Sequence, residues 1–143
     1  MELANRHNLN RGYMRLNVWN DAVGLFRFTS SSLNEIRKLD FKLKSQTLDA
    51  VQPISSNIAG GYCRQSLKEY LQFLYIASGS RSEGMTRMVS LKEAGQLDRK
   101  VFDKFDELHH ATENKLLALV KSLQAELKDN NWNEKLEAAQ TSL

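Results

Sequence analysis

Residues 53–83 read PISSNIAGGYCRQSLKEYLQFLYIASGSRSE and decide the fold of this chain. The stretch holds the only proline of the sequence, the Gly60-Gly61 pair and the clearest helix start. Ser66 is followed three residues later by Glu69, which is the spacing of a capping box, in which the serine hydroxyl accepts a hydrogen bond from the Glu69 N–H group. This pattern predicts a helix-turn-helix corner, with the second helix of the corner beginning near Ser66.

Apolar and small residues recur at three- and four-residue spacing after Ser66, which predicts a long amphipathic helix. We expect this helix to end at Gly95, because glycine readily adopts the left-handed conformation of a C-terminal cap. Gly79 and Ser80 form a short strip of small residues with Ala77, which should allow another helix or subunit to approach closely. The inward positions are Leu67, Tyr70, Leu71, Leu74, Ala77, Ser78, Ser82, Met85, Met88 and Val89.

Two shorter helices are predicted before this corner. The first begins at Asn17, a suitable N-cap, and the connection after it lies within residues 30–40, where short hydroxyl side chains weaken helix propensity. The second is expected to kink near Asp49-Ala50, because Pro53 lacks an N–H group and crowds the preceding turn. The inward positions are Trp19, Ala22, Val23, Phe26, Ser30 and Leu33 in the first helix, and Leu43, Thr47, Ala50, Val51, Ile54 and Ile58 in the second.

A fourth helix is predicted from Asp98, its N-cap, to about Lys128, and residues 129–133 (DNNWN) are expected to break it. Four amphipathic helices joined by short connections predict an all-α fold, an antiparallel up-down-up-down four-helix bundle over residues 16–128. We expect residues 1–15 to be a flexible basic arm and residues 129–143 to be a tail or a short extra helix. The inward positions of the fourth helix are Val101, Phe105, Leu108, Thr112, Leu116, Leu119, Val120, Leu123 and Leu127.

Charge is distributed unevenly along the chain, whose net charge is +3. Residues 1–92 carry 13 Lys/Arg against 7 Asp/Glu, and residues 93–143 carry 7 against 10. A clustered positive surface attracts polyanions, of which nucleic acid is the commonest, although a surplus of this size also suits an ordinary solvated surface. A single cysteine, Cys63, and no apolar run of membrane-spanning length favour a cytoplasmic protein without disulfides and without a membrane partner.

Few residues suggest catalysis. Glu107 and His110 have the spacing of a di-iron carboxylate motif, but the sequence holds no second copy of that motif. We therefore expect His109 and His110 to be hydrated on the outer face of the fourth helix. Cys63 has no necessary catalytic partner, so neither an enzyme activity nor a metal or other cofactor is predicted.

The same core stretch resembles a known family, the four-helix-bundle proteins encoded in intervening sequences of bacterial 23S rRNA genes. The matching residues are Ser56, Asn57, Ile58, Ala59, Gly61, Arg64, Ser66, Glu69, Phe73, Leu74, Ile76, Ala77, Gly79, Ser80 and Glu83. The resemblance implies a homo-oligomer, which is a pentameric ring in some members. It implies structural roles for Asn57 as an organiser of the turn into the third helix, and for Gly61, Arg64, Ser66, Glu69, Gly79, Ser80 and Glu83. The architecture is also similar to that of the accessory variability determinant proteins of diversity-generating retroelements, which partner a reverse transcriptase.

These observations leave two main hypotheses. The first is a non-catalytic homo-oligomer that binds nucleic acid, RNA in preference to DNA, as an accessory or scaffold factor; a reverse transcriptase is a less favoured partner. Its phosphate-binding surface would be drawn from Arg15, Arg27, Arg37, Lys38, Lys42, Lys44, Arg64, Lys68, Arg81 and Arg87. The second is a protein-interaction module without nucleic-acid affinity, which would bury apolar residues outside the predicted stripes against identical subunits or another protein. Those residues are Leu25, Phe28, Phe41, Tyr75 and Trp132.

Overall fold

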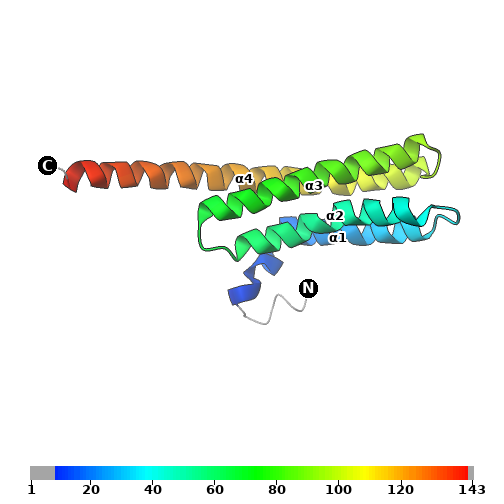
Figure 1. Ribbon diagram of the computed structural model, residues 1–143, viewed down its shortest axis with the longest axis horizontal. Helices are drawn as coiled ribbons and strands as arrows, with labels where there is room; N and C mark the ends of the chain where they lie inside the picture. The colour runs from blue at the N-terminus through cyan, green and yellow to red at the C-terminus, as the bar shows by residue number, and fades with distance from the viewer. Residues whose placement is uncertain (1–8, 142–143) are drawn as a thin grey trace.

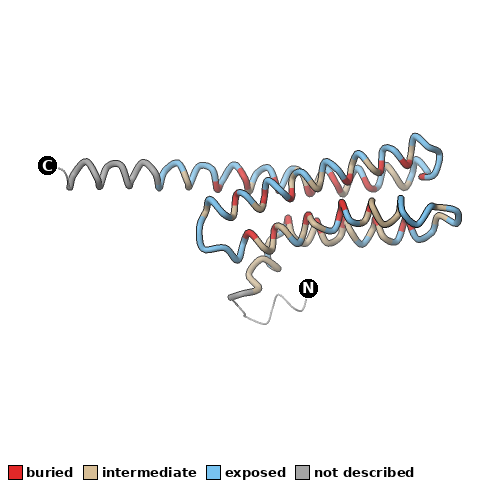
Figure 2. The backbone as a smooth tube through the Cα atoms, viewed as in Figure 1, coloured by how far each residue is buried: buried red, intermediate tan, exposed pale blue. Residues whose placement is uncertain are grey.

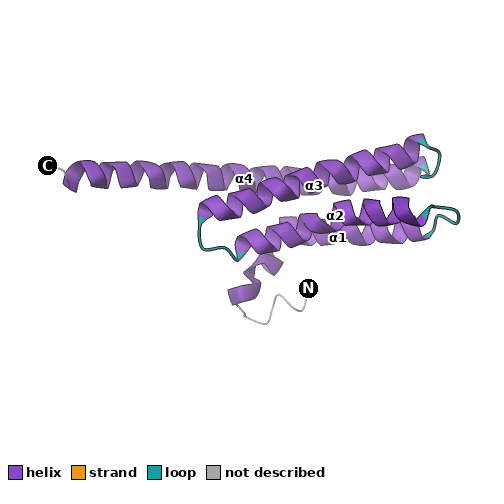
Figure 3. Ribbon diagram, viewed as in Figure 1, coloured by secondary structure: helices purple, strands orange, loops and turns teal. Residues whose placement is uncertain are grey.

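The computed structural model describes the backbone of residues 9–141 and the side chains of residues 11–130. Within that range the elements are η2 (Leu9–Arg15, a 3-10 helix), α1 (Asn17–Asn34), α2 (Phe41–Tyr62), α3 (Leu67–Glu93) and α4 (Arg99–Thr141). Each α-helix packs against the next, and α1 also packs against α4, which makes the predicted up-down bundle (Figure 1). The turns after α1 and α3 lie at one end of the bundle, and the turn after α2 lies at the other (Figure 3).

Three helix caps follow the predicted chemistry, whereas the N-cap of α1 is Leu16, without a side-chain hydrogen bond, and not Asn17 as predicted. Ser66 Oγ accepts a hydrogen bond from the Glu69 N–H at 3.1 Å, which confirms that α3 starts at the capping serine. Gly95 has φ +74°, and the N–H of Gln96 donates to the Leu91 carbonyl at 2.9 Å, as expected for a glycine that terminates a helix. Asp98 caps α4 by accepting from the Lys100 N–H at 3.4 Å.

Buried residues line the sides of the helices that face one another (Figure 2). The largest fully buried side chains include Phe105, Leu25, Ile54 and Leu74, which come from all four helices. In α2 the predicted inward positions are buried except Leu43, which is 44 % exposed near the helix start. The helix passes through Pro53 as one element.

The predicted inward face of α1 is confirmed at Ala22 and Leu33, which are buried, and is wrong by about one residue of rotation elsewhere. Val18, Leu25 and Thr29 are buried, whereas Trp19 and Phe26 flank the core and are only partly buried. Thr29 is tolerated there because its hydroxyl donates to the Leu25 carbonyl at 2.7 Å, which satisfies the polar group inside its own helix. Leu25 is therefore a core residue, and Phe28 packs against the core.

Both ends of the chain differ from expectation. The predicted flexible arm includes η2, which folds against α1 and α2, while residues 1–8 lie outside the described range. The fourth helix does not break at residues 129–133, but continues to Thr141 and extends past the other helices (Figure 1). Asp and Asn lower helix propensity only modestly, and residues 124–141 contain neither Gly nor Pro. The side chain of Trp132 is outside the described residues.

Two glycines of α3 lie in different surroundings. Gly84 is buried against α2, and a Cβ atom added there would lie 3.0 Å from Val51 Cγ2. Gly79 is exposed, and a Cβ atom added there would meet no atom within 4 Å. Close approach of α2 therefore explains Gly84, whereas packing within the chain does not require Gly79.

Candidate nucleic-acid interface

The ten basic residues of the predicted interface divide into ion-paired and unpaired groups. Arg81 and Arg87, both on α3, have carboxylate partners in the described part of the chain. The other eight have none there: they are Arg15, Arg27, Arg37, Lys38, Lys42, Lys44, Arg64 and Lys68. Cations without a carboxylate partner keep their charge available for a phosphate, so these eight are the better candidates.

Arg81 belongs to a polar cluster between α3 and α4. Its Nη1 atom lies 2.5 Å from Glu113 Oε2, and its side chain is only 13 % exposed. His109 is 4 % exposed, and its Nε2 atom lies 3.2 Å from the Arg81 carbonyl oxygen. Burial lowers the pKa of His109, because desolvation disfavours the charged imidazolium more than the Arg81 carbonyl favours it. The guanidinium of Arg81 thus holds two helices together.

The expectation that both histidines are hydrated is half wrong. His110 is exposed, with Nδ1 3.8 Å from Glu113 Oε1, whereas His109 stacks beside Phe105 with ring centroids 5.7 Å apart. His109 follows Phe105 by four residues and precedes Thr112 by three, so helical spacing alone could have placed it on the buried stripe.

Arg87 is bound on α3 and across to α2. Its guanidinium lies 3.3 Å from Glu83 Oε1 and donates to Gln46 Oε1 at 3.2 Å. Glu83, one of the residues given a structural role by the family resemblance, therefore orients an arginine that joins two helices. The i,i+4 spacing of Glu83 and Arg87 can be read from the sequence, whereas the hydrogen bond between Arg87 and Gln46 depends on the packing of α2 on α3.

The net positive charge of the bundle lies in one half of it, which we call the α1–α2 layer (residues 9–62). This layer carries seven Lys/Arg against four Asp/Glu, whereas residues 63–141, the α3–α4 layer, carry twelve of each. None of the seven cations forms an ion pair within the described residues. Of the acids, Asp21 is paired with Lys115 of α4, and Asp40 caps α2. Because Asp21 is paired with a cation of the other layer, the excess positive charge of this layer remains on η2, α1 and α2.

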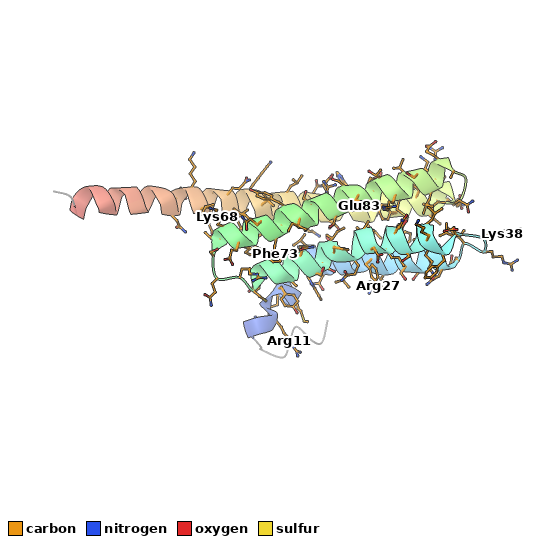
Figure 4. All side chains as sticks on the ribbon, viewed as in Figure 1. Arg11, Arg27, Lys38, Lys68, Phe73 and Glu83 are labelled. Atoms are coloured by element: carbon orange, nitrogen blue, oxygen red, sulfur yellow. The ribbon has the colours of Figure 1, made fainter. Side chains whose placement is uncertain are left out.

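Figure 4 shows how the candidates spread along the bundle. Arg27 lies along α1, Lys38 projects from the turn between α1 and α2, and Lys68 lies at the opposite end, on the first turn of α3. The 22 residues of α2 separate the two ends by about 33 Å at 1.5 Å per residue. One short ligand cannot reach both ends of one chain, so the basic end at the α1–α2 turn and the basic end at the α2–α3 turn are separate surfaces.

The α2–α3 turn is held by packing of α3 on glycine. A Cβ atom added to Gly61 would lie 2.8 Å from Phe73 Cβ and 3.1 Å from the Tyr70 carbonyl oxygen, so α3 contacts the backbone of α2 there. The guanidinium of Arg64 lies 4.6 Å from the Phe73 ring centroid. Gly61 and Arg64 therefore both contact α3 at this turn. An open cleft of about 520 Å³ lies at this turn, lined by Cys63, Arg64, Gln65, Ser66 and Glu69.

An aromatic cluster fixes η2 to this end of the bundle. Tyr13 packs on Trp19 and Tyr62, with ring centroids 5.5 and 6.3 Å apart, and Tyr62 packs on Tyr70 at 6.1 Å. Burial raises the pKa of Tyr70 to about 12, and the neighbouring Tyr62 adds to the shift. Trp19 therefore packs against η2 at the edge of the core.

Two other residues of the family motif lie elsewhere. The side-chain amide of Asn57 donates to the Pro53 carbonyl at 2.8 Å, so it bonds one turn back in α2 rather than across the turn into α3. Ser80 is half-buried beside the exposed Gly79. Neither residue belongs to the unpaired cationic surface.

Among the residues that the structure describes, no group of three or more His, Cys, Asp or Glu is placed to hold a metal ion. Glu107 Oε2 lies 3.6 Å from Lys104 Nζ on the exposed side of α4, so this carboxylate is engaged with a lysine. None of the described helices is long and apolar enough to cross a membrane.

Comparison with known proteins gave one family. The family model described as "23S rRNA-intervening sequence protein" matches residues 14–118, which cover α1, α2, α3 and the first part of α4. No curated protein sequence matched the chain.

Proposed function

The chain belongs to the 23S rRNA-intervening sequence protein family, and on that premise we propose that it is a non-catalytic homo-oligomer that binds RNA or DNA as an accessory or scaffold factor. RNA is the favoured ligand, and the α1–α2 layer is the binding surface. Six of the eight unpaired cations of the candidate set lie in this layer, whereas Arg64 and Lys68, at the α2–α3 turn, lie outside it. The six are Arg15, Arg27, Arg37, Lys38, Lys42 and Lys44.

The unpaired cations of the α1–α2 layer carry this proposal. Every Lys or Arg of the described residues that forms an ion pair lies on α3 or α4. Cations that have no carboxylate partner repel one another, and a bound polyanion reduces that repulsion and releases counterions. The layer is about as long as α2, roughly 33 Å, which matches the length of about ten base pairs.

An exposed strip on α3 and α4 supports self-association. Tyr75, Ile76 and Leu117 are 49 %, 55 % and 45 % exposed, and Gly79 lies open beside them on α3. Tyr75 accepts a hydrogen bond from Gln124 of α4 at 2.9 Å, so the two helices present one continuous face. We propose this face as the contact between copies, with a pentamer as the expected assembly.

Binding is tested by fluorescence anisotropy of labelled structured RNA and duplex DNA across a salt series, on protein whose mass is fixed by light scattering. We expect binding that weakens linearly in log salt concentration, because each phosphate contact releases counterions. The double change Arg27→Glu with Lys42→Glu should abolish binding at moderate salt. The matched double change Lys121→Glu with Lys128→Glu, on exposed positions of α4, should have little effect. Absence of binding at low salt would refute the proposal.

Self-association has its own test. Light scattering of the full chain should give a mass of several subunits, and Ile76→Glu should reduce it, because a carboxylate cannot be buried unpaired in an apolar contact. Val89→Glu, also at an exposed apolar position of α3, is the control and should leave the mass unchanged. A monomeric wild-type chain would contradict the homo-oligomer.

A further inference from the structure

The turn between α1 and α2 exposes an aromatic ring. Phe41, the first residue of α2, is 81 % exposed, more than any other large hydrophobic side chain among the described residues. Leu43, two residues further on, is 44 % exposed. Nothing in the described fold covers the Phe41 ring, although aromatic side chains usually bury most of their surface.

Cations flank this ring in the sequence. Arg37, Lys38 and Lys42 are exposed, Lys44 is half-buried, and none has a carboxylate partner in the described residues. Figure 4 shows Lys38 projecting from the tip of the bundle. The turn therefore offers an exposed ring within a group of unpaired cations.

The nearest acidic residue is already engaged. The Asp40 carboxylate accepts hydrogen bonds from the backbone N–H groups of Lys42 and Leu43 at 2.8 and 3.2 Å, so it caps α2 and forms no ion pair with the described cations of the turn. The turn between α3 and α4 lies at the same end (Figure 3), and its charges nearly cancel. Those charged residues are Lys92, Glu93, Asp98, Arg99 and Lys100.

We propose that Phe41 is a stacking platform for an unpaired base of single-stranded nucleic acid, whose phosphates are bound by Arg37, Lys38 and Lys42. Proteins that bind single strands combine these two elements, a positively charged track for the backbone and an aromatic ring for a base. Every base has a π-face, so a single exposed ring can add stacking energy to the binding of any single strand. This inference rests on the proposed nucleic-acid function and specifies the form of ligand and the end of the bundle that binds it.

Two other ligands fit the turn less well. A lipid surface needs more apolar area than one phenylalanine and one half-exposed leucine, since even a single myristoyl chain anchors a protein only marginally. A protein interface of ordinary size buries about 800 Å² on each partner and is depleted of charge at its centre, whereas this ring lies among four cations. A base stacked on the ring leaves those cations at the wet edge, where phosphates lie.

The test compares Phe41→Ala with the wild-type full chain, using a labelled poly-uridine strand and a blunt RNA duplex as probes at low salt. Loss of one base stack should weaken single-strand binding by about 5- to 150-fold and leave duplex binding unchanged. Phe41→Trp should retain the affinity, and Val89→Ala, at an exposed apolar position of α3, should match the wild type on both probes. Thermal unfolding should be the same for all variants, because Phe41 contributes little buried surface.

The outcomes separate this inference from the function on which it rests. If the wild type binds the RNA probes and Phe41→Ala binds the single strand equally well, the inference is overturned and the proposed function stands. If the wild type binds neither probe, both fail. If Phe41 is needed for binding to anionic vesicles while RNA is not bound, the ligand is a lipid surface and the inference is again overturned.

Discussion

Alanine at Gly79 and at Gly84 should change the stability of the bundle in opposite directions. Both residues lie inside α3, so each change brings the same gain in helix propensity, about 1 kcal/mol. At Gly79 nothing opposes that gain, because the new Cβ atom meets no atom within 4 Å. At Gly84 the Cβ atom would lie 3.0 Å from Val51 Cγ2, closer than an ordinary van der Waals contact. Overpacking a core costs about 1–3 kcal/mol, so Gly84→Ala should lower the free energy of unfolding by about 0–2 kcal/mol.

Val51 gives the mechanism a second check. Its side chain is 1 % exposed and branched at Cβ, so it cannot easily rotate away from the added methyl group. In a Val51→Ala background the cost at Gly84 should largely disappear. A double-mutant cycle measures this coupling directly.

Urea unfolding followed by circular dichroism provides the assay, with all variants at one concentration and their masses checked by light scattering. The two single variants should differ by about 1–3 kcal/mol. Equal stabilities for Gly79→Ala and Gly84→Ala would refute the close approach of α2 and α3. An altered mass for Gly79→Ala would show that the proposed contact between copies includes Gly79 itself.

Three further predictions concern ionisable groups. The pKa of His109 in the folded chain is below its unfolded value of about 6.5, so the free energy of unfolding should fall by up to about 1.4 kcal/mol per pH unit as the pH drops below that value. Urea titrations at pH 5–7 should show this slope, and the His109→Gln variant should lack it. Arg81→Ala should destabilise the chain by about 1–3 kcal/mol, because it removes the ion-pair partner of Glu113 between α3 and α4. Arg87→Ala removes a more exposed ion pair and should cost less than about 1 kcal/mol. Equal losses of stability would contradict the structural role of the Arg81 cluster between α3 and α4. An ultraviolet titration should show one tyrosine ionising near pH 12, and this transition should be absent from Tyr70→Phe. The free energy of unfolding should decline as the pH rises above about 10, where tyrosines of the unfolded chain ionise. A single transition near pH 10 for all tyrosines would argue against the burial of Tyr70.

The fold was predictable because turn chemistry is local. The Ser66 cap, the Gly95 stop and the Asp98 cap each involve residues within a few positions of one another, and each occurs as predicted. The end of α4 was not predictable in this way. Asp and Asn inside residues 129–133 resemble a break, but helix propensity alone is too weak to end a helix without Gly or Pro.

Residues that depend on tertiary contacts were harder to place. Leu25 could not be assigned to the core of α1 because that helix carries apolar residues on more than one face, and Thr29 hides its hydroxyl by bonding the Leu25 carbonyl. The ion pair of Arg81 with Glu113 joins two helices that sequence spacing does not connect. Composition did show a basic excess in residues 1–92, but only the pairing of helices located it on α1 and α2 rather than α3.

The central claim is that unpaired cations of the α1–α2 layer bind phosphates, and the slope of log affinity against log salt tests it most directly. Neutral changes Arg27→Gln and Lys42→Gln should each reduce the slope for duplex binding by about 0.9, the value for one phosphate contact. Lys121→Gln on α4 should leave the slope unchanged. If all three variants keep the wild-type slope, or if Lys121→Gln lowers it as much as the other two, the α1–α2 layer is not the nucleic-acid interface.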